Sequence, residues 1–488
     1  MSKNVVLICV DQWRGDCLSA AGHPVVRTPH LDELAARGTR FARAYSATPT
    51  CVPARAALHT GLSQTGHGRV GYEDGVAWTP YDTTLAGSFR AAGYQTKCVG
   101  KMHVYPERHR LGFDDIELHD GYLHQARIGG RDPRGHDDYL GWLADQAGTG
   151  AAEDYTDHGL NCNSNVARPW DKPERLHPTN WATMRAVDFL HRRDTTAPFF
   201  LFLSYHRPHP PYDPPDWAFQ QYLAAPAGDG PPVGDWEDDY AAWRRDGVHD
   251  AFVGRMDPVS WQRARAGYYG HMAHIDLQIN RFLQSLAEFG LQDDTVVAFV
   301  SDHGEMLGEH GMWRKGYPYE GSARVPFLVA GPGVPQGAVC EEVVELRDVM
   351  PTLLDAAGVA VPETVEGRSA LPAARGEGEL RPWLHGEHVL FGQSLQWLTD
   401  GREKYVWRSG DGLEQLFDLA ADPGELTNLA ADPDAAPRLK LWRERLAGEL
   451  AGRPEGFADG GELVPGRPVD PVLPGLRAAA ADSLQGVL

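Results

Sequence analysis

The sequence is short of cysteines, short of cations and free of long apolar runs, and each shortage excludes a class of protein. Its six cysteines among 488 residues are scattered, and none forms the CxxC pairs typical of zinc sites or redox motifs. Lysine and arginine number 46 against 67 acidic residues, and the net charge of −21 disfavours partners such as nucleic acid or anionic membranes. An anionic substrate must therefore meet a local basic pocket.

The N-terminus lacks the pattern of an export signal. Lys3 and Asn4 are followed by six apolar residues before Asp11, which is too short for a signal-peptide core or a membrane span. Reduced thiols are the simpler interpretation of the scattered cysteines. We therefore expect a cytoplasmic protein that has no membrane partner and acts on small molecules.

The length predicts more than one domain, because a single core rarely grows to 488 residues. We expect a catalytic domain over residues 1–375 and a smaller C-terminal domain over 376–450, where short strands are predicted at 404–407 and 416–419. Residues 451–488 are rich in Pro, Gly and Ala, and they are predicted to form an extended tail or an arm for homo-oligomer contacts.

Four short apolar runs, rich in β-branched or aromatic residues, predict buried strands. These runs are residues 5–10, 96–99, 198–203 and 295–300. Polar, charged or imidazole side chains follow each run, and helical stretches such as 28–37 and 261–288 lie between them. The alternation predicts an α/β fold with a mostly parallel sheet flanked by helices, whose polar strand ends converge on one site.

Two long segments, 121–181 and 213–254, are rich in Gly, Pro, Asp and Trp and exceed the usual length of connections. We expect them to be insertions that carry lids or substrate loops and determine specificity. Trp13, Trp78, Trp313 and the aromatic residues of these insertions are candidates to shape a pocket for an aryl or quaternary-ammonium group, although most tryptophans serve packing.

The sharpest local signal is the segment CVPARAALHTG at residues 51–61. Pro53 suits the first turn of a helix and Gly61 suits its end, so Cys51 is expected at the helix N-terminus. The unpaired N–H groups there favour an anion, and Arg55 lies one turn further on. Taken alone, Cys51 is equally well interpreted as a buried structural thiol.

The pattern Cys-x-Pro-x-Arg followed by Leu-x-Thr-Gly resembles the first sulfatase signature, in which the cysteine is converted to formylglycine. The segment GYQTKCVGKMH at residues 93–103 looks like the second signature. Further matching positions across residues 1–435 are Asp11, 208–211, 302–304, Lys315, 324–326, 416–419, 422–423 and 428–429. The chain thus resembles formylglycine-dependent sulfatases of the alkaline phosphatase superfamily, in the branch near choline sulfatases, arylsulfatases and phosphonate monoester hydrolases. The resemblance implies an alkaline phosphatase-like fold with a smaller C-terminal α+β domain.

The resemblance also implies one divalent cation. Its ligands would be Asp11, Gln12, Asp302 and His303, together with the modified Cys51. Gln12 and His303 depart from the commonest sulfatase pattern, which has Asp-Asp and often Asp-Asn at these places. The wider family favours Ca²⁺, whereas the amide and imidazole ligands favour Mn²⁺ or Mg²⁺. Asp302 and His303 alone are also compatible with a capped helix start.

A basic pocket is expected around the transferred group, formed by Arg55, Lys101, His103, His209 and Lys315. By resemblance, one hydroxyl of a hydrated aldehyde at position 51 attacks sulfur, and the second, deprotonated by His103, expels sulfate. Lys101, Lys315 and Arg55 would stabilise the charged oxygens, and His209 or Lys315 would protonate the leaving alcohol. His206 and His274 are further candidates for substrate contact.

Three other functions are compatible with parts of this pattern. A phosphonate monoester or phosphodiester hydrolase would use the same modified residue, but the motif Lys101-Met102-His103 favours sulfate by resemblance. A Cys-His-Asp acyl hydrolase with an unmodified thiolate would need no metal and would be sensitive to thiol reagents. A binding protein would keep the pocket without turnover. The expected partners of a sulfatase are a small-molecule sulfate ester and, during maturation, a formylglycine-generating enzyme.

Overall fold

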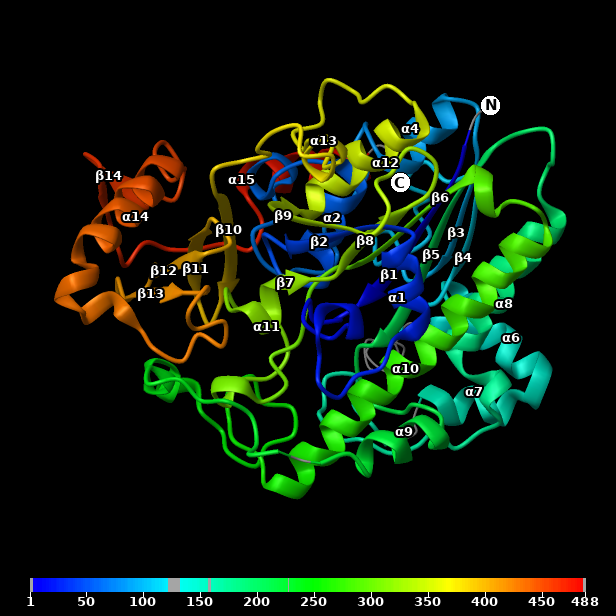
Figure 1. Cartoon of the computed structure of the whole chain (residues 1–488), viewed down its shortest axis with the longest axis horizontal. Helices are drawn as coiled ribbons and strands as arrows, with labels where there is room; N and C mark the ends of the chain where they lie inside the picture. The colour runs from blue at the N-terminus through cyan, green and yellow to red at the C-terminus, as the bar shows by residue number, and fades with distance from the viewer. Residues whose placement is uncertain (1–2, 122–131, 157–158, 227, 486–488) are drawn as a thin grey trace.

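The structure, a computed structural model, describes residues 3–121, 132–156, 159–226 and 228–485. Figure 1 shows a central sheet with helices on both sides and, beside it, a smaller sheet formed by the later part of the chain. The predicted α/β class is therefore confirmed. Part of the predicted insertion at 121–181 lies outside the described residues.

The central sheet contains all four predicted strands: β1 (Asn4–Asp11), β3 (Gln95–Gly100), β5 (Phe199–Pro208) and β6 (Thr295–Ser301). Its other strands are β2 (Gly38–Tyr45), β4 (Asp115–Leu118), β7 (Arg324–Val325), β8 (Phe327–Ala330) and β9 (Ala338–Glu345). The strand order is β4-β3-β5-β1-β6-β8-β2-β7, and β9 pairs with β2. The first five strands in this order run parallel, whereas β8 is antiparallel to β6 and β2.

The register of the parallel strands brings their carboxyl ends level with one another. Ser204 of β5 pairs with Cys9 of β1 on one side and with Gly100 of β3 on the other. Val10 of β1 pairs with Ser301 of β6. The polar residues that follow these strands therefore meet at one edge of the sheet, as expected for a parallel sheet with a site at its carboxyl ends.

Alternate side chains of β1 enter two separate cores, because successive residues of a strand point to opposite faces. Ile8 packs with α1 (Pro29–Ala36), α8 (Pro178–Arg192) and α10 (Pro258–Glu288). Leu7 packs on the other face with α2 (Cys51–Thr60), α4 (Leu85–Ala91) and α12 (Val349–Ala357). Both faces are covered, so β1 is buried throughout (Figure 1).

The smaller domain is an antiparallel sheet covered by one helix. Its strands are β10 (Leu384–Leu390), β11 (Gln393–Thr399), β12 (Glu403–Arg408) and β13 (Glu414–Asp418). Trp442 of α14 (Ala436–Glu449) packs with Tyr405 and Leu416 on one face. Trp397 and Phe417 lie on the other face of this sheet, where they pack in an aromatic cluster with residues of the catalytic domain such as Tyr319. The predicted strands at 404–407 and 416–419 are confirmed as β12 and β13.

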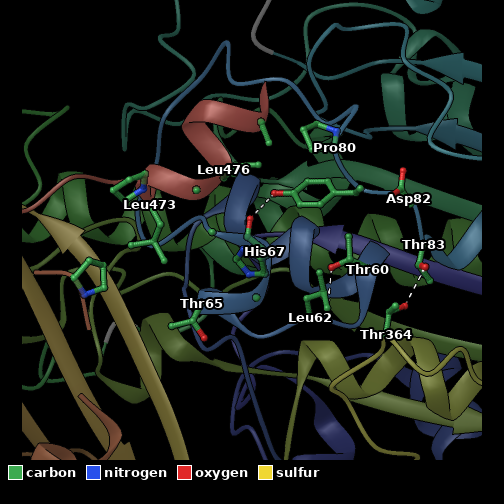
Figure 2. A pocket seen from close by; sticks show the side chains of 17 residues that line it. Thr60, Leu62, Thr65, His67, Pro80, Asp82, Thr83, Thr364, Leu473 and Leu476 are labelled. Atoms are coloured by element: carbon green, nitrogen blue, oxygen red, sulfur yellow. Dashed lines mark hydrogen bonds between the residues drawn. The ribbon is translucent and has the colours of Figure 1, made fainter. Parts of the chain in front are cut away.

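The C-terminal segment differs from the extended tail that its composition predicted. It forms a short hairpin, β14 (Ala458–Asp459) with β15 (Glu462–Leu463), and a helix, α15 (Pro474–Gln485). Leu473 donates its backbone N–H to the carbonyl of Gly68 at 2.8 Å. Figure 2 shows Leu473 and Leu476 beside His67 in a groove of about 640 Å³. The segment folds back onto its own catalytic domain because its apolar residues find a partner there.

The predicted insertions carry short helices in their described parts. These and the remaining short helices are α3 (Gln64–His67), α6 (Asp138–Ala147), α7 (Thr149–Thr156), α9 (Asp216–Leu223), α11 (Glu320–Ala323) and α13 (Leu371–Ala374). Among the described residues, no helix combines the length and apolarity needed to cross a bilayer. All six cysteines are free and buried.

Candidate active site

Cys51 is the first residue of α2, as the sequence predicted. Thr50 before it is extended, and Gly61 ends the helix in the left-handed conformation (φ 68°), which glycine adopts at low cost. The Cys51 side chain is fully buried. It therefore occupies a helix N-terminus, where backbone N–H groups favour an anion.

Four predicted ligands meet around this position. The Sγ atom of Cys51 lies 3.7 Å from Oδ1 of Asp11 and 3.2 Å from Nε2 of His303. The same His303 nitrogen lies 3.3 Å from Oδ1 of Asp11 and 3.7 Å from Oδ1 of Asp302. One ligand atom from each of the four residues lies within 4.8 Å of the others. The ends of β1 and β6 and the start of α2 thus build one cluster.

Backbone groups orient His303 and Asp302. Nδ1 of His303 donates to the carbonyl of Gly304 at 2.9 Å, which leaves Nε2 as the ring nitrogen directed into the cluster. Oδ1 of Asp302 accepts the backbone N–H groups of Gln12 and His303 at 3.1 and 3.0 Å. No helix begins directly after Asp302, so these contacts do not form the helix cap that the local sequence also allowed.

Burial and the neighbouring charges shift the pKa values of these ligands. Burial raises the pKa of Asp302. For Asp11, the neighbouring Lys101 outweighs burial and holds the pKa well below its usual range. Burial alone would lower the pKa of His303, but Asp302 and Cys51 raise it to about 10. Two carboxylates in a solvent-free cluster therefore draw positive charge toward this point.

Gln12, which follows Asp11, has an unusual backbone conformation. Its φ of 71° lies in the left-handed region, which is rare for residues other than glycine. Its amide nitrogen donates to Glu305, and its amide oxygen accepts from Nζ of Lys315 at 2.6 Å. Since Glu305 takes the nitrogen, the oxygen is the atom that faces the basic side of the site.

Lys101 and Arg55 neutralise the carboxylates of Asp11 and Asp302. Nζ of Lys101 contacts Oδ2 of Asp11, and both side chains are fully buried. Nε of Arg55 donates to Oδ2 of Asp302 at 2.9 Å, and its Nη1 donates to the Lys101 carbonyl at 2.7 Å and to Ser204 Oγ at 3.0 Å. Arg55 thus orients a predicted ligand and does not line the cavity above Cys51.

The surroundings of Cys51 stabilise a negative charge. Burial and Asp11 would raise the pKa of the thiol, but Lys101, Lys315 and His303 lower it well below its usual range. The sulfur stands where the oxygen of an oxidised side chain would stand. The same cations would stabilise an oxygen anion at this position.

His103 lies beside Cys51 in a hydrogen-bonded pair with Asp74. Its Nε2 is 3.5 Å from Oδ1 of Asp74, and its φ of 59° is again left-handed. Burial and Lys101 lower its pKa, but hydrogen bonds to Asp74 and Cys51 outweigh them and raise it to about 9. With a thiolate beside it, the imidazole ring is therefore protonated on both nitrogens and positively charged at neutral pH.

His209 and Lys315 form a second hydrogen-bonded pair in the site. Nδ1 of His209 donates to the Pro210 carbonyl at 2.8 Å, so its Nε2 is the acceptor for Nζ of Lys315 at 2.6 Å. Burial and Lys315 hold the pKa of His209 well below its usual value, so the ring is neutral. Lys315 lines the cavity, and His209 stands behind it.

A cavity of about 300 Å³ lies above Cys51. It is lined by Thr50, Cys51, Tyr72, Asn163, Phe252, Arg314, Lys315 and residues 388–392. Both predicted insertions contribute to its wall, through Asn163 and Phe252. Trp13, Trp78 and Trp313 do not line it, and all three are buried in the cores. The three tryptophans were therefore wrong as candidates for an aromatic pocket, because their indoles serve packing. The aromatic wall comes from residues 72, 252 and 391, of which Phe252 belongs to the predicted insertion 213–254.

Two residues of the site were missed by the sequence interpretation. Asp74 lies in a loop without secondary structure, and Glu305 lies two residues after His303 with its carboxylate on the Gln12 amide. The position of Glu305, two residues after the predicted ligand His303, was the signal in the sequence that could have identified it as a site residue. Two histidines were further candidates for substrate contact. Nδ1 of His206 lies 3.8 Å from Oδ2 of Asp11, whereas His274 is hydrogen-bonded to Asn180 in the core.

The residues present fit a divalent cation. Two buried carboxylates and an imidazole nitrogen lie within 4.8 Å of one another beside Cys51, and such oxygen and nitrogen donors are compatible with Mg²⁺, Mn²⁺ or Ca²⁺. The amide oxygen of Gln12, also a predicted ligand, accepts a hydrogen bond from Lys315 instead. Lys101 and Arg55 bind the Oδ2 atoms of Asp11 and Asp302, respectively. The Oδ1 atoms of both carboxylates therefore face the cluster. The cluster is thus built for positive charge.

Comparison with known proteins agrees with this geometry. The Sulfatase family model matches residues 3–359, and the model "N-sulphoglucosamine sulphohydrolase, C-terminal" matches residues 308–450. The chain is 46% identical to an arylsulfatase of Clostridium perfringens over 96% of this chain and 98% of that protein. It is 30% identical to a choline-sulfatase of Rhizobium meliloti, over 88% of this chain and 83% of that one.

Among solved structures, the phosphonate monoester hydrolase of Agrobacterium radiobacter is similar with a TM-score of 0.73 and 28% identity. The match covers 91% of this chain and 95% of that one. The family model covers well over half of the chain, and the arylsulfatase matches nearly its full length. The chain belongs to the sulfatase family.

Proposed function

We propose that this protein hydrolyses sulfate monoesters of the aryl type, with residue 51 as the nucleophile after its conversion to formylglycine. The observation that carries the proposal is the position of Cys51. It lies at the start of α2, 3.7 Å from Asp11 and 3.2 Å from His303, on the floor of a cavity. The 46% identity to an arylsulfatase supports the reaction class.

The metal and the modified residue supply the chemistry that the ordinary side chains lack. We propose that Asp11, Gln12, Asp302 and His303 hold one divalent cation next to residue 51. A cation there would favour ionisation of a hydroxyl on a hydrated formylglycine, which becomes nucleophilic at neutral pH. The family favours Ca²⁺, and the imidazole and amide ligands also suit Mn²⁺ and Mg²⁺.

The cations of the site would bind the sulfate oxygens. Lys315 lines the cavity, and Lys101 lies under residue 51. Each places a buried positive charge where charge builds up on the nonbridging oxygens, which is worth more in a solvent-free site than in water. We assign Arg55 a positioning role, because its guanidinium is occupied by Asp302.

Two pairs would move protons. Lys315 carries the protons that face the cavity, and neutral His209 accepts one of them, so we assign Lys315 as the acid for the leaving oxygen and His209 as its positioning partner. We assign His103 as the base at residue 51. The thiolate contributes to its raised pKa, and this contribution ends when Cys51 is replaced by an uncharged group.

A phosphonate monoester hydrolase is the second candidate, supported by the structural similarity to the enzyme of Agrobacterium radiobacter. Steady-state kinetics on phenyl sulfate and on phenyl phenylphosphonate separate the two functions. The proposal expects the larger kcat/KM on the sulfate. A larger value on the phosphonate would replace the proposal with the second candidate.

Maturation and location belong to the same proposal. We infer that a formylglycine-generating enzyme acts on the segment 51–55 before the chain folds, because Cys51 is fully buried afterwards. The six free cysteines support a reducing compartment such as the cytoplasm. Fractionation of the producing cells, followed by immunoblotting, tests this location.

A further inference from the structure

The cavity above Cys51 has an aromatic wall and one cation that the sulfate chemistry does not use. Phe252, Phe391 and Tyr72 line it, and Arg314 lies next to Phe252. The guanidinium carbon of Arg314 is 4.6 Å from the centre of the Phe252 ring. A ring-shaped leaving group on this wall would therefore meet a guanidinium at its edge.

Arg314 and Lys315 are consecutive but point to different ends of the cavity. Lys315 reaches Gln12 and His209, close to residue 51. Arg314 lies over Phe252 and donates through Nη2 to the Asp250 carbonyl. The backbone N–H of Arg314 donates to the Glu305 carboxylate. This hydrogen bond holds the backbone at the place where the side chains of Arg314 and Lys315 diverge. The two cations thus address different parts of a substrate.

The charge of Arg314 is not balanced as it is for other buried guanidinium groups near the site. Arg55, Arg14 and Arg207 each have a carboxylate oxygen within 2.7–2.9 Å. Among the residues that the structure describes, no carboxylate lies within 4.0 Å of the Arg314 guanidinium, and its buried Nε has no hydrogen-bond partner.

The pKa values follow this difference. Burial outweighs the attraction of Glu305 and Asp250 and lowers the pKa of Arg314. For Arg55 and Arg207, the neighbouring aspartates outweigh burial and raise the pKa. Arg314 is partly buried, and a cation that is partly removed from water without its own anion gains from a ligand that supplies one. None of the described residues that line the cavity is acidic.

We propose that the leaving group is a ring that carries a carboxylate, and that Arg314 binds this carboxylate while the sulfate group lies over residue 51. The inference rests on the proposed sulfatase function and specifies its substrate class. A guanidinium suits a carboxylate because it donates two parallel N–H groups. A quaternary-ammonium alcohol such as choline would meet a like charge in the same place.

Matched substrates test this assignment. Phenyl sulfate and 3-carboxyphenyl sulfate have leaving groups of similar acidity, because a meta carboxylate changes the phenol little. A charge-assisted contact predicts that kcat/KM is about 10- to 100-fold larger for the carboxylated substrate. A 3-trimethylammoniophenyl sulfate is expected to be the poorest of the three after correction for its more acidic phenol.

Arg314→Gln is the variant that isolates the residue. The ratio of kcat/KM for 3-carboxyphenyl over phenyl sulfate is expected to fall to near one in Arg314→Gln. The matched control is Arg245→Gln, since Arg245 lies 3.8 Å from Asp250 but is exposed and outside the cavity, and the ratio should survive in it.

The outcomes are distinct. A wild-type ratio of one or less overturns the inference, and so does a preference that persists in Arg314→Gln. Turnover of neither sulfate by the modified, metal-loaded enzyme refutes the proposed function itself, and the inference with it. Turnover of both sulfates without preference leaves the sulfatase function intact and removes only the role of Arg314.

Discussion

Nε2 of His303 lies 3.2 Å from Sγ of Cys51, and the other ring nitrogen is held by the Gly304 carbonyl. Nε2 is thereby directed at the cysteine that aligns with the modified residue of the family. Asp11 and Asp302 approach the same nitrogen within 3.7 Å. The proposed nucleophile and its proposed ligands are thus preorganised by the backbone of two strand ends and one helix start.

Replacement of Cys51 by alanine tests the nucleophile. Cys51→Ala is expected to lower kcat on phenyl sulfate by about 10,000-fold or more, because removal of a nucleophile leaves only binding and electrostatic effects. The fold should survive, since the change removes one atom. Cys340→Ala, in β9, is the control and should keep its activity. Similar losses in both variants would contradict a special role for Cys51.

Removal of the metal is expected to abolish hydrolysis reversibly. Dialysis against a chelator should stop turnover, and Ca²⁺, Mn²⁺ or Mg²⁺ should restore it to different degrees, which identifies the preferred ion. Asp11→Asn should lower the metal content measured by inductively coupled plasma mass spectrometry, because a neutral amide binds these ions less well than a carboxylate. A chelated, metal-free enzyme with an unchanged rate would refute the site.

Lys101→Ala should discriminate between substrates. We expect it to depress kcat/KM for phenyl sulfate by about 100-fold or more, because Lys101 lies beneath the nucleophile beside Asp11. A phosphonate ester carries an organic substituent where sulfate has a bare oxygen, so its hydrolysis should fall less. The control is Lys97→Ala on β3, the strand that Lys101 follows, because the Lys97 ammonium binds Glu117 away from the site. Equal losses on both substrates in Lys101→Ala would contradict this account.

The C-terminal helix is expected to support the loop that carries Tyr72 and Asp74. Arg477 of α15 contacts Glu73 through two hydrogen bonds of 2.9 Å, and Val70 N–H donates to the Pro471 carbonyl at 2.9 Å. Leu476→Asp should release α15, because it places a charge in a buried apolar contact.

The expected readout of Leu476→Asp is a rise in KM for phenyl sulfate of about threefold or more, with the central core intact. Near-ultraviolet circular dichroism and thermal unfolding report the fold. Leu441→Asp on α14 is the control, because Leu441 is 46% exposed. A KM that stays at the wild-type value while α15 is released, as judged by proteolysis of the C-terminus, would refute the supporting role.

The parts predicted correctly from the sequence are those in which chemistry and local pattern coincide. β1 and β6 are continuous apolar runs that end in Asp11 and Asp302, so strand and ligand were visible together. Cys51 was visible because Pro53 and Gly61 bound a short helix. The parallel sheet brings Asp11, Asp302 and His303 together beside Cys51, as expected for its carboxyl ends, while their role as metal ligands stays a proposal.

The parts that were missed depend on contacts between distant segments. Asp74 lies near His103 because its loop packs between Val389 of β10 and residues 471–473, and nothing in its own neighbourhood predicts this. Phe252 and Phe391 meet in the cavity wall from separate domains. The C-terminal segment has a composition typical of a tail, yet it finds an apolar groove near His67.

The most direct test of the account is peptide mass spectrometry of residue 51 in preparations of graded activity. Coexpression with different amounts of a formylglycine-generating enzyme would vary the fraction of chains that carry an aldehyde at residue 51. The account predicts that kcat on phenyl sulfate rises in proportion to this fraction and extrapolates to zero for the thiol form. A fully active preparation that contains only unmodified Cys51 would contradict it.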